Sequence, residues 1–257
     1  MKRFATTLAL LAVCAAPSFA LPILSESFSY PDGNLAPNGG WANFSGANTD
    51  VQVNAGRATG SGPNANDDHI FFTAQPTTGK TYACFDVIIP TIAGAPKAIY
   101  FAALKDAGTA NFVSRLYVLP VAGGFTFGIS HSSTSATVGV TAWSATSLNY
   151  NQRYNIVINY DPIAKSSTLW VNPANESSPS VTNTNAAIAA LSTSTFAIRQ
   201  SASASTLPAV PSYAGTADWG FSIDNLGIGI NFDDACDLYH TVPAQRSTWG
   251  AVKAIYR

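Results

Sequence analysis

The clearest pattern along the chain is a two-residue alternation of side-chain character. The segment Tyr154–Asp161 reads YNIVINYD, so every second residue from Tyr154 to Tyr160 is large and apolar. Successive side chains of a strand point to opposite faces of its sheet. This segment is therefore predicted to be a half-buried strand, and Ser167–Asn172 is predicted to pair with it across a turn that begins at Asp161.

Similar strand patterns recur along the chain. They are rich in β-branched and aromatic residues and are bounded by turn residues such as Gly, Pro, Asn and Asp. The predicted strands are Thr81–Pro90, Lys97–Lys105, Phe112–Pro120, Phe125–His131, Thr195–Gln200 and Phe221–Ile230. Only Asn185–Leu191 has a weakly helical pattern, and it is predicted to form a single turn.

Two segments near opposite ends of the chain predict how the sheets close. Residues 26–41 read ESFSYPDGNLAPNGGW, in which a strand runs into a Pro-Asp-Gly turn, and residues 219–234 read WGFSIDNLGIGINFDD, a strand broken by glycines. First and last strands of this kind lie side by side in closed antiparallel sandwiches. We therefore expect an all-β fold with two antiparallel sheets.

The N-terminus has the features of a signal peptide. Two basic residues precede an apolar run over residues 4–16, and the small residues Ser18 and Ala20 mark a cleavage site. The run is shorter than the roughly 20 residues that a membrane span needs. Cys14 follows a valine instead of the small residue expected before a lipidated cysteine. We expect residues 1–20 to be removed during export, with no membrane insertion.

Composition agrees with an exported β-protein. Charged residues make up 11% of the chain, well below the usual quarter or so. The formal net charge of -1 comes without any basic cluster. A protein that neutralises phosphates over a long surface needs such a cluster, so nucleic acid is excluded as the expected partner.

The domain organisation is predicted to be simple. No Pro-rich or charged linker divides the chain, so residues 21–240 are expected to form one domain. Residues 241–257 are expected to be a C-terminal tail. In it, Trp249, Val252 and Tyr256 have the spacing of one side of a short helix.

Two cysteines remain once the signal peptide is removed. Cys84 and Cys236 lie in or beside predicted strands, and export would place them in an oxidising compartment. We expect them to form a disulfide. The alternative is two buried free thiols, and neither cysteine has the neighbouring His or Cys of a metal or redox site.

Four segments together carry a resemblance to a known family: residues 26–33 (ESFSYPDG), 153–161 (RYNIVINYD), 167–173 (STLWVNP) and 221–235 (FSIDNLGIGINFDDA). The chain resembles bacterial secreted proteins with a concanavalin A-like, or laminin-G-like, jelly-roll domain. The resemblance covers nearly all of Glu26–Leu238 and implies two curved antiparallel sheets with glycans bound on the concave face or its rim. It implies fold more than activity, because this fold carries lectins, glycosidases, lyases, adhesins and structural modules.

A glycosidase would require two neighbouring carboxylates. Laminarinase-like members of this fold carry them as Glu-x-Asp-x-x-Glu on one strand, a pattern that is absent here. Glu26 and Glu176, the only glutamates of the chain, have no acidic partner at short spacing. Asp233, Asp234 and Asp237 cluster after the last strand and are expected to be solvated turn residues. The chain is therefore predicted not to be an enzyme.

A polysaccharide lyase is the catalytic alternative that the residues leave open. Arg115 and Tyr117 share a face of their predicted strand, where an arginine could neutralise a uronate and a tyrosine could act as a base. The three histidines, His69, His131 and His240, lie far apart in the sequence. No nucleophile motif accompanies them.

Calcium is the one cofactor that the sequence leaves open. Hard cations take six to eight oxygen ligands. The acidic or amide-rich segments that could supply such oxygens are Asp32–Asn34, Asn64–Asp68 and Asp224–Asn225. None has a recognisable ligand spacing, so no metal ligand is assigned.

Binding surfaces for sugars are made of exposed aromatic rings with polar neighbours, because pyranose rings present apolar C–H faces. Tyr100, Arg115, Tyr117 and Trp143 are the candidate ligand-binding residues, whereas core packing is favoured for Trp170. The expected function is an exported, non-catalytic, lectin-like module that binds polysaccharide or cell-surface glycan. A structural or adhesive surface protein without a sugar ligand is the closest alternative.

Overall fold

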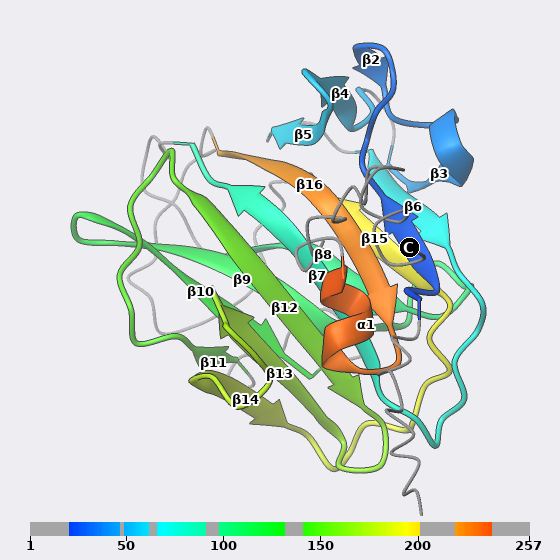
Figure 1. The fold of residues 1–257 in the computed structure, drawn as a ribbon, viewed down its shortest axis with the longest axis vertical. Helices are drawn as coiled ribbons and strands as arrows, with labels where there is room; N and C mark the ends of the chain where they lie inside the picture. Colours follow the sequence, from blue (N-terminus) through cyan, green and yellow to red (C-terminus); the bar gives the residue numbers. More distant parts are fainter. Residues whose placement is uncertain are drawn as a thin grey trace, which may run out of the picture.

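The computed structural model describes residues 21–46, 49–61, 66–90, 98–131, 141–200 and 219–237. In these residues two antiparallel sheets pack face to face, with one short α-helix outside them (Figure 1). The expected all-β jelly-roll sandwich is confirmed. The predicted signal peptide (1–20) and C-terminal tail (241–257) lie outside the described residues.

The larger sheet has nine strands in the order β14-β13-β12-β7-β16-β5-β4-β2, and β1 also pairs with β16. Its central strands, β7 and β16, come from the first third and the end of the described chain. The strand bounds are β1 Leu24–Glu26, β2 Gly33–Asn34, β4 Gln52–Asn54, β5 Arg57–Ser61, β7 Thr81–Ile88, β12 Arg153–Asp161, β13 Ser166–Val171, β14 Ser180–Thr184 and β16 Gly220–Gly229.

The smaller sheet has seven strands in the order β11-β10-β9-β8-β15-β6-β3. A 3-10 turn, η1 (Asn38–Gly40), precedes its first strand. The strand bounds are β3 Trp41–Ser45, β6 Asp67–Phe71, β8 Ile99–Lys105, β9 Phe112–Val121, β10 Gly124–Ser130, β11 Ala142–Trp143 and β15 Thr195–Arg199.

All the strands predicted from long apolar patterns are present, with ends shifted by at most two residues. The predicted pairing of the two chain ends is also confirmed, because β1 pairs with β16 in the register Leu24↔Ile228. The single turn expected within Asn185–Leu191 is present. Only a turn forms there, in which the Ile188 amide donates to the Asn185 carbonyl.

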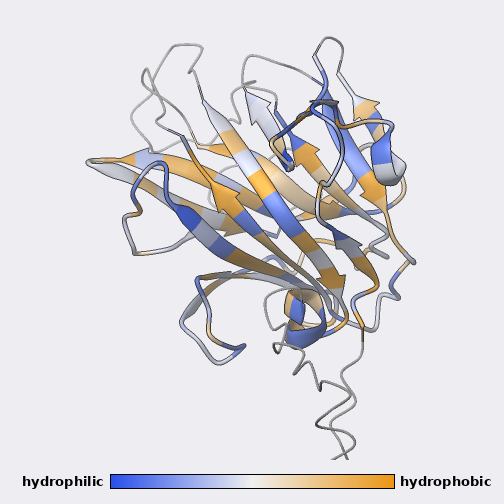
Figure 2. Ribbon diagram, turned by 45° about the horizontal axis from the view of Figure 1, so that its top comes forward, coloured by the Kyte–Doolittle hydropathy of each residue, from blue (hydrophilic) through white to orange (hydrophobic). Residues whose placement is uncertain are grey.

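The apolar side chains of the alternating pattern pack in the space between the two sheets. All four residues of the predicted apolar face of β12, from Tyr154 to Tyr160, belong to the main core. Val157, on the opposite face, packs in a separate cluster with Trp170 on the outside of the larger sheet. Apolar and polar positions accordingly alternate along the strands in Figure 2.

Helix α1 (Phe232–Cys236) covers part of the outer face of the larger sheet (Figure 1). Cys84 on β7 and Cys236 form the expected disulfide, with 5.3 Å between their Cα atoms. Glycines of β16 allow this close approach. A Cβ added to Gly227 would lie 2.1 Å from the Ala235 carbonyl oxygen.

The acidic cluster of Asp233, Asp234 and Asp237 lies within and at the end of this helix instead of in a turn, contrary to expectation. Asp233 and Asp234 lie in the first turn of α1, where negative charge is favourable. The Asp234 amide donates to the side chain of the N-cap residue Asn231, and Asp234 itself is buried. The positions of Asp233 and Asp234 are therefore explained by the N-terminus of the helix.

Glu26 organises the N-terminal corner. Its buried carboxylate accepts hydrogen bonds from the Phe28 amide, the Tyr30 hydroxyl and the Trp41 indole N–H, at 2.6, 2.7 and 3.0 Å. Burial and the adjacent carboxylate raise the pKa of Tyr30 to about 12. Glu26 thus connects both ends of the 26–41 segment.

No helix among the described residues is long and apolar enough to cross a lipid bilayer.

Replacing the two cysteines tests how much the disulfide stabilises the fold. The double variant Cys84→Ser/Cys236→Ser should lose about 2–5 kcal/mol of unfolding free energy, because the bridge joins positions 152 residues apart. Urea unfolding of both proteins measures the loss. Reduced wild-type protein should match the variant, and equal stability of the oxidised wild type and the variant would contradict the prediction.

Candidate functional site

The four candidate ligand-binding residues meet on the outer face of the smaller sheet. Tyr100 on β8 is the direct register partner of Tyr117 on β9, and their ring centroids are 5.7 Å apart. Trp143 on β11 packs edge-on against Tyr117 at 6.2 Å. Together with Arg115, these side chains lie outside the core between the sheets.

Arg115 stacks on aromatic rings. Its guanidinium lies 4.8 Å from the ring centroid of Tyr100 and 4.9 Å from that of Phe112. The guanidinium of Arg199 on β15 lies 4.4 Å from the same Tyr100 ring. Such cation–π contacts fix the Tyr100 ring between two positive charges.

A β-bulge in β9 brings Arg115 and Phe112 to one face. Ser114 has the left-handed φ of 49°, and the pairing with β8 shifts at this point. Ser114 turns inward, where its hydroxyl donates to the Asn159 carbonyl at 2.9 Å. Arg115 and Tyr117 both contact the Tyr100 ring, which confirms the prediction that they share a face.

The same face continues toward β6 and β3. Phe44 stacks on His69 at 4.9 Å, and the Lys105 ammonium lies 4.9 Å from the Phe44 ring centroid. Phe44 also reaches Phe112 at 6.0 Å. We call this surface the aromatic–cationic face; it comprises Phe44, His69, Tyr100, Lys105, Phe112, Arg115, Tyr117, Trp143 and Arg199.

Five members of this face were not predicted from the sequence: Phe44, His69, Lys105, Phe112 and Arg199. No local signal existed for Phe112, because it lies three residues before Arg115, and only the bulge at Ser114 brings the two to one face. None existed for Phe44, His69 and Arg199, which come from strands whose place in the sheet depends on long-range pairing.

Burial divides the candidate residues into two layers. Tyr117 and Arg115 are only 0% and 2% exposed, whereas Tyr100 and Trp143 are half-buried. Burial raises the pKa of the Tyr117 hydroxyl, and the neighbouring Arg115 charge opposes this shift. Tyr117 therefore stays protonated at neutral pH, which suits it poorly to the role of a general base.

The chain's two glutamates are both engaged in structural contacts. Glu26 accepts the three hydrogen bonds described above, and Glu176 accepts one from the Tyr82 hydroxyl at 2.6 Å. The Trp170 indole donates to the Glu176 carbonyl and packs against α1, which confirms a packing role for Trp170. Neither glutamate lies on the aromatic–cationic face.

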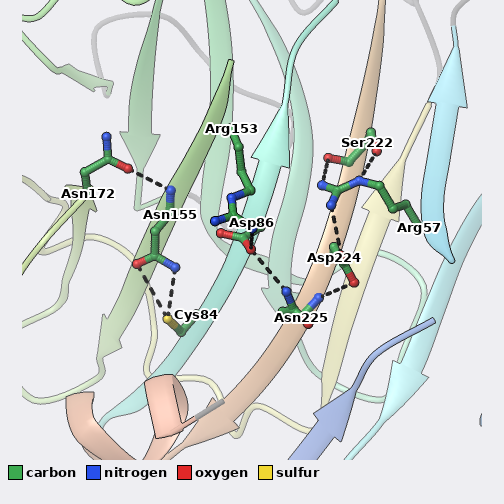
Figure 3. A network of polar contacts seen from close by, with 9 residues as sticks. All are labelled: Arg57, Cys84, Asp86, Arg153, Asn155, Asn172, Ser222, Asp224 and Asn225. Atoms are coloured by element: carbon green, nitrogen blue, oxygen red, sulfur yellow. Dashed lines mark hydrogen bonds and ion pairs between the residues drawn. The ribbon is translucent and has the colours of Figure 1, made fainter. Parts of the chain in front are cut away.

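A charged ladder crosses the outer face of the larger sheet (Figure 3). The Arg57 guanidinium forms an ion pair of 2.9 Å with Asp224 and donates to the Ser222 hydroxyl. Arg57 lies on β5 and the other two residues on β16. Burial raises the pKa of Asp224, and the Arg57 charge opposes that shift.

Asp86 on β7 is the second carboxylate of this ladder and the register partner of Asp224. The Asn225 side chain donates to Asp86 at 3.1 Å, and Arg153 approaches it at 3.7 Å (Figure 3). The sequence analysis did not identify this carboxylate pair. Each member is matched by an arginine, so the ladder is compensated in charge.

The segments considered for calcium now have explanations, with one exception. Asp32 accepts the Ala55 amide, and Asp224 and Asn225 belong to the ladder. Within the described part of the chain, no group of three or more His, Cys, Asp or Glu side chains lies close enough together to hold a metal ion. Asn64 lies outside the described residues, and the exception is Asp68, whose side chain is fully buried.

Two hollows lie away from the aromatic–cationic face. One, of about 410 Å³, lies at the ends of β5, β7 and β16 and includes Pro90 and Trp219 in its lining. The other, of about 300 Å³, lies beside β13 and β14 and includes Leu148 and Val181. Neither contains any of the four candidate residues.

The aromatic–cationic face predicts acid sensitivity through His69. Burial, and then the Lys105 charge, lower the pKa of His69 to about 4, against about 6.5 in an unfolded chain. The unfolded state then binds more protons between these values, so stability should fall as the pH drops from about 6.5 to about 4. NMR titration of the imidazole should give the lowered pKa.

His69→Phe, which keeps a ring against Phe44, should make the unfolding free energy depend less on pH in this range. His131, whose pKa burial likewise lowers to about 4, adds to the slope, whereas Asp68, whose pKa is raised to about 6, opposes it below about pH 6. A pKa near 6.5 for His69 in the folded protein would contradict the prediction.

No protein-family model matches the chain, and no curated protein matches it in sequence. Among solved structures, the CBM2 module of the evolved Dit protein from Lactobacillus casei BL23 phage J-1 aligns with a TM-score of 0.52 and 13% identity, over 83% of this chain and 97% of that one. A sialidase aligns with a TM-score of 0.50 and 14% identity, over 82% of this chain and 19% of that one. The binding domain of botulinum neurotoxin serotype D/C (VPI 5993) gives 0.50 and 9%, over 88% and 53%. The chain thus spans less than two thirds of the sialidase and neurotoxin chains, and these likenesses show its fold.

Proposed function

We propose that this chain is an exported, non-catalytic, lectin-like module that binds polysaccharide or a cell-surface glycan through the aromatic–cationic face. The observation that carries the proposal is the contiguous group of Tyr100, Tyr117 and Trp143 rings on an outer sheet face. Aromatic rings with polar neighbours are the surfaces on which sugar rings stack.

The two layers of this face have different roles in the proposal. Tyr100 and Trp143, which are half-buried, contact the sugar. Arg115 and Tyr117, which are almost fully buried, position those rings from below through cation–π and edge-on contacts. Rings held in one orientation lose little freedom when a ligand binds.

The chemistry of the described residues supports binding over catalysis. Tyr117 remains protonated at neutral pH, both glutamates have structural hydrogen bonds, and the Asp86–Asp224 pair is matched by arginines. The aromatic–cationic face as described contains no Asp or Glu, so it lacks the carboxylate pair of a hydrolase. Its one imidazole, His69, packs between the Phe44 and Phe71 rings.

Export is supported by the disulfide, since such bonds persist mainly in oxidising compartments. The similar solved structures support the fold alone. The choice of glycan as ligand therefore rests on the rings and charges of the aromatic–cationic face.

A structural or adhesive protein without a sugar ligand is the second candidate. The near-complete burial of Arg115, Tyr117 and Lys105 favours it, because buried side chains contribute to packing more than to recognition. Such a protein should self-associate without sugar, which analytical ultracentrifugation detects.

The binding proposal is tested with protein spanning residues 21–257 on a panel of immobilised polysaccharides, in gels that report retention. Tyr100→Ala and Trp143→Ala should each weaken retention by about two- to tenfold, the loss of one ring contact. Tyr117→Phe, which keeps the ring, should weaken it less. Ile163→Ala, an exposed apolar change in the hairpin between β12 and β13, is the matched control and should have no effect.

The same incubations distinguish the alternatives. New reducing ends or unsaturated products would identify an enzyme and overturn the non-catalytic assignment. Absence of retention on every polysaccharide, together with concentration-dependent self-association, would favour the structural role. Retention that survives both alanine variants would place the binding surface elsewhere.

A further inference from the structure

Asp68 on β6 is a buried carboxylate whose charge is left uncompensated. Its side chain is fully buried, and its Oδ2 atom has no hydrogen-bond partner. The carboxylate receives a long contact of 3.5 Å at Oδ1 from the Asn43 side chain and an interaction with the Val51 backbone, both from neutral groups. Leaving a buried carboxylate oxygen unpaired is costly, so such an atom requires a specific explanation.

The position of Asp68 is at a corner where the two sheets meet. It lies two residues before Ile70 and therefore shares the core-facing side of β6. The backbone of Val51, just before β4 of the larger sheet, interacts with the Asp68 carboxylate. Asp68 thus reaches from the smaller sheet toward the edge of the larger one.

A second carboxylate lies at the same corner. The negative charge of Asp50 adds to burial in raising the pKa of Asp68, to about 6. The two oxygens of Asp50 accept hydrogen bonds from the side-chain amides of Asn66 and Asn34. These neutral amide donors leave the negative charge of Asp50 in place.

No lysine or arginine among the described residues forms an ion pair with Asp50 or Asp68. The nearest arginine contact on β6 is that of Arg199 with Asp67, at 3.9 Å. Asp67 precedes Asp68 and lies on the opposite face of the strand. Two carboxylates therefore approach each other without a protein cation between them.

We propose that Asp50 and Asp68 bind a divalent cation of the calcium type, with the amide-bearing Asn66 at its edge. Ca²⁺ takes carboxylate, amide and water oxygens in flexible geometry, which matches the side chains gathered here. The ion neutralises both carboxylates and links the edge of the smaller sheet to that of the larger one. Asn34, Asn66 and Asp68 come from two segments singled out in the sequence, whereas Asp50 carried no signal.

The cation site does not depend on glycan binding, so it is tested by direct metal binding. Calcium-free protein is titrated with Ca²⁺ by calorimetry and with Tb³⁺ by luminescence, and its melting temperature is measured with Ca²⁺ and with a chelator. The wild type should bind one ion and melt more than about 2 °C higher with saturating Ca²⁺.

Asp68→Asn and Asp50→Asn should each abolish ion binding and the calcium-dependent rise in melting temperature. Asp32→Asn is the matched control: it makes the same chemical change in a neighbouring exposed turn and should leave both signals intact. Asp50→Asn affects a less buried side chain and keeps the test valid if Asp68→Asn fails to fold.

Absence of binding in the wild type would overturn the proposal, as would binding that persists in both Asp50→Asn and Asp68→Asn. In either case the carboxylates would share a proton instead, and Asp68→Asn should then stabilise the protein at neutral pH without any response to Ca²⁺.

Discussion

The architecture depends on a single β-bulge at Asn225 in strand β16. This strand pairs with β1, β5 and β7, so it joins the two chain ends to the centre of the larger sheet. Asn225 has a left-handed φ of 52°, and the register shifts between Asp224 and Gly227. The extra residue changes which side chains face outward. Before it, Ser222 and Asp224 form the charged ladder; after it, glycines make room for α1 and the disulfide.

The two outer faces of the sandwich are consequently different in chemistry. On the larger sheet, half of the face is covered by α1, and the other half carries arginines and aspartates that neutralise one another, such as Arg57 with Asp224. On the smaller sheet, cations stack on aromatic rings, as Arg115 does on Tyr100 and Lys105 on Phe44. Rings combined with positive charge offer a ligand surface that a compensated ladder does not, which is why recognition is assigned to the smaller sheet.

Strand β6 connects this surface to the proposed cation site. His69 faces outward and stacks on Phe44, while its neighbour Asp68 faces inward at the corner between the sheets. Because adjacent residues on a strand point to opposite faces, an ion held by Asp68 would restrain the strand from below without touching the aromatic–cationic face. Ion binding and ligand binding can therefore be varied separately by mutation.

The sequence by itself determined the strands, because the two-residue alternation of β12 and the apolar runs of β7, β8 and β9 are local properties of the chain. It also determined that Arg115 and Tyr117 share a face, which needs only the period of a strand. The tertiary structure decided which strands are neighbours, and hence that Tyr100 meets Tyr117 and that Arg199, His69 and Phe44 join them. It also decided burial, for Arg115 and Tyr117 above all. Pairing between distant strands and the depth of a side chain depend on contacts across the whole chain, and no local pattern encodes them.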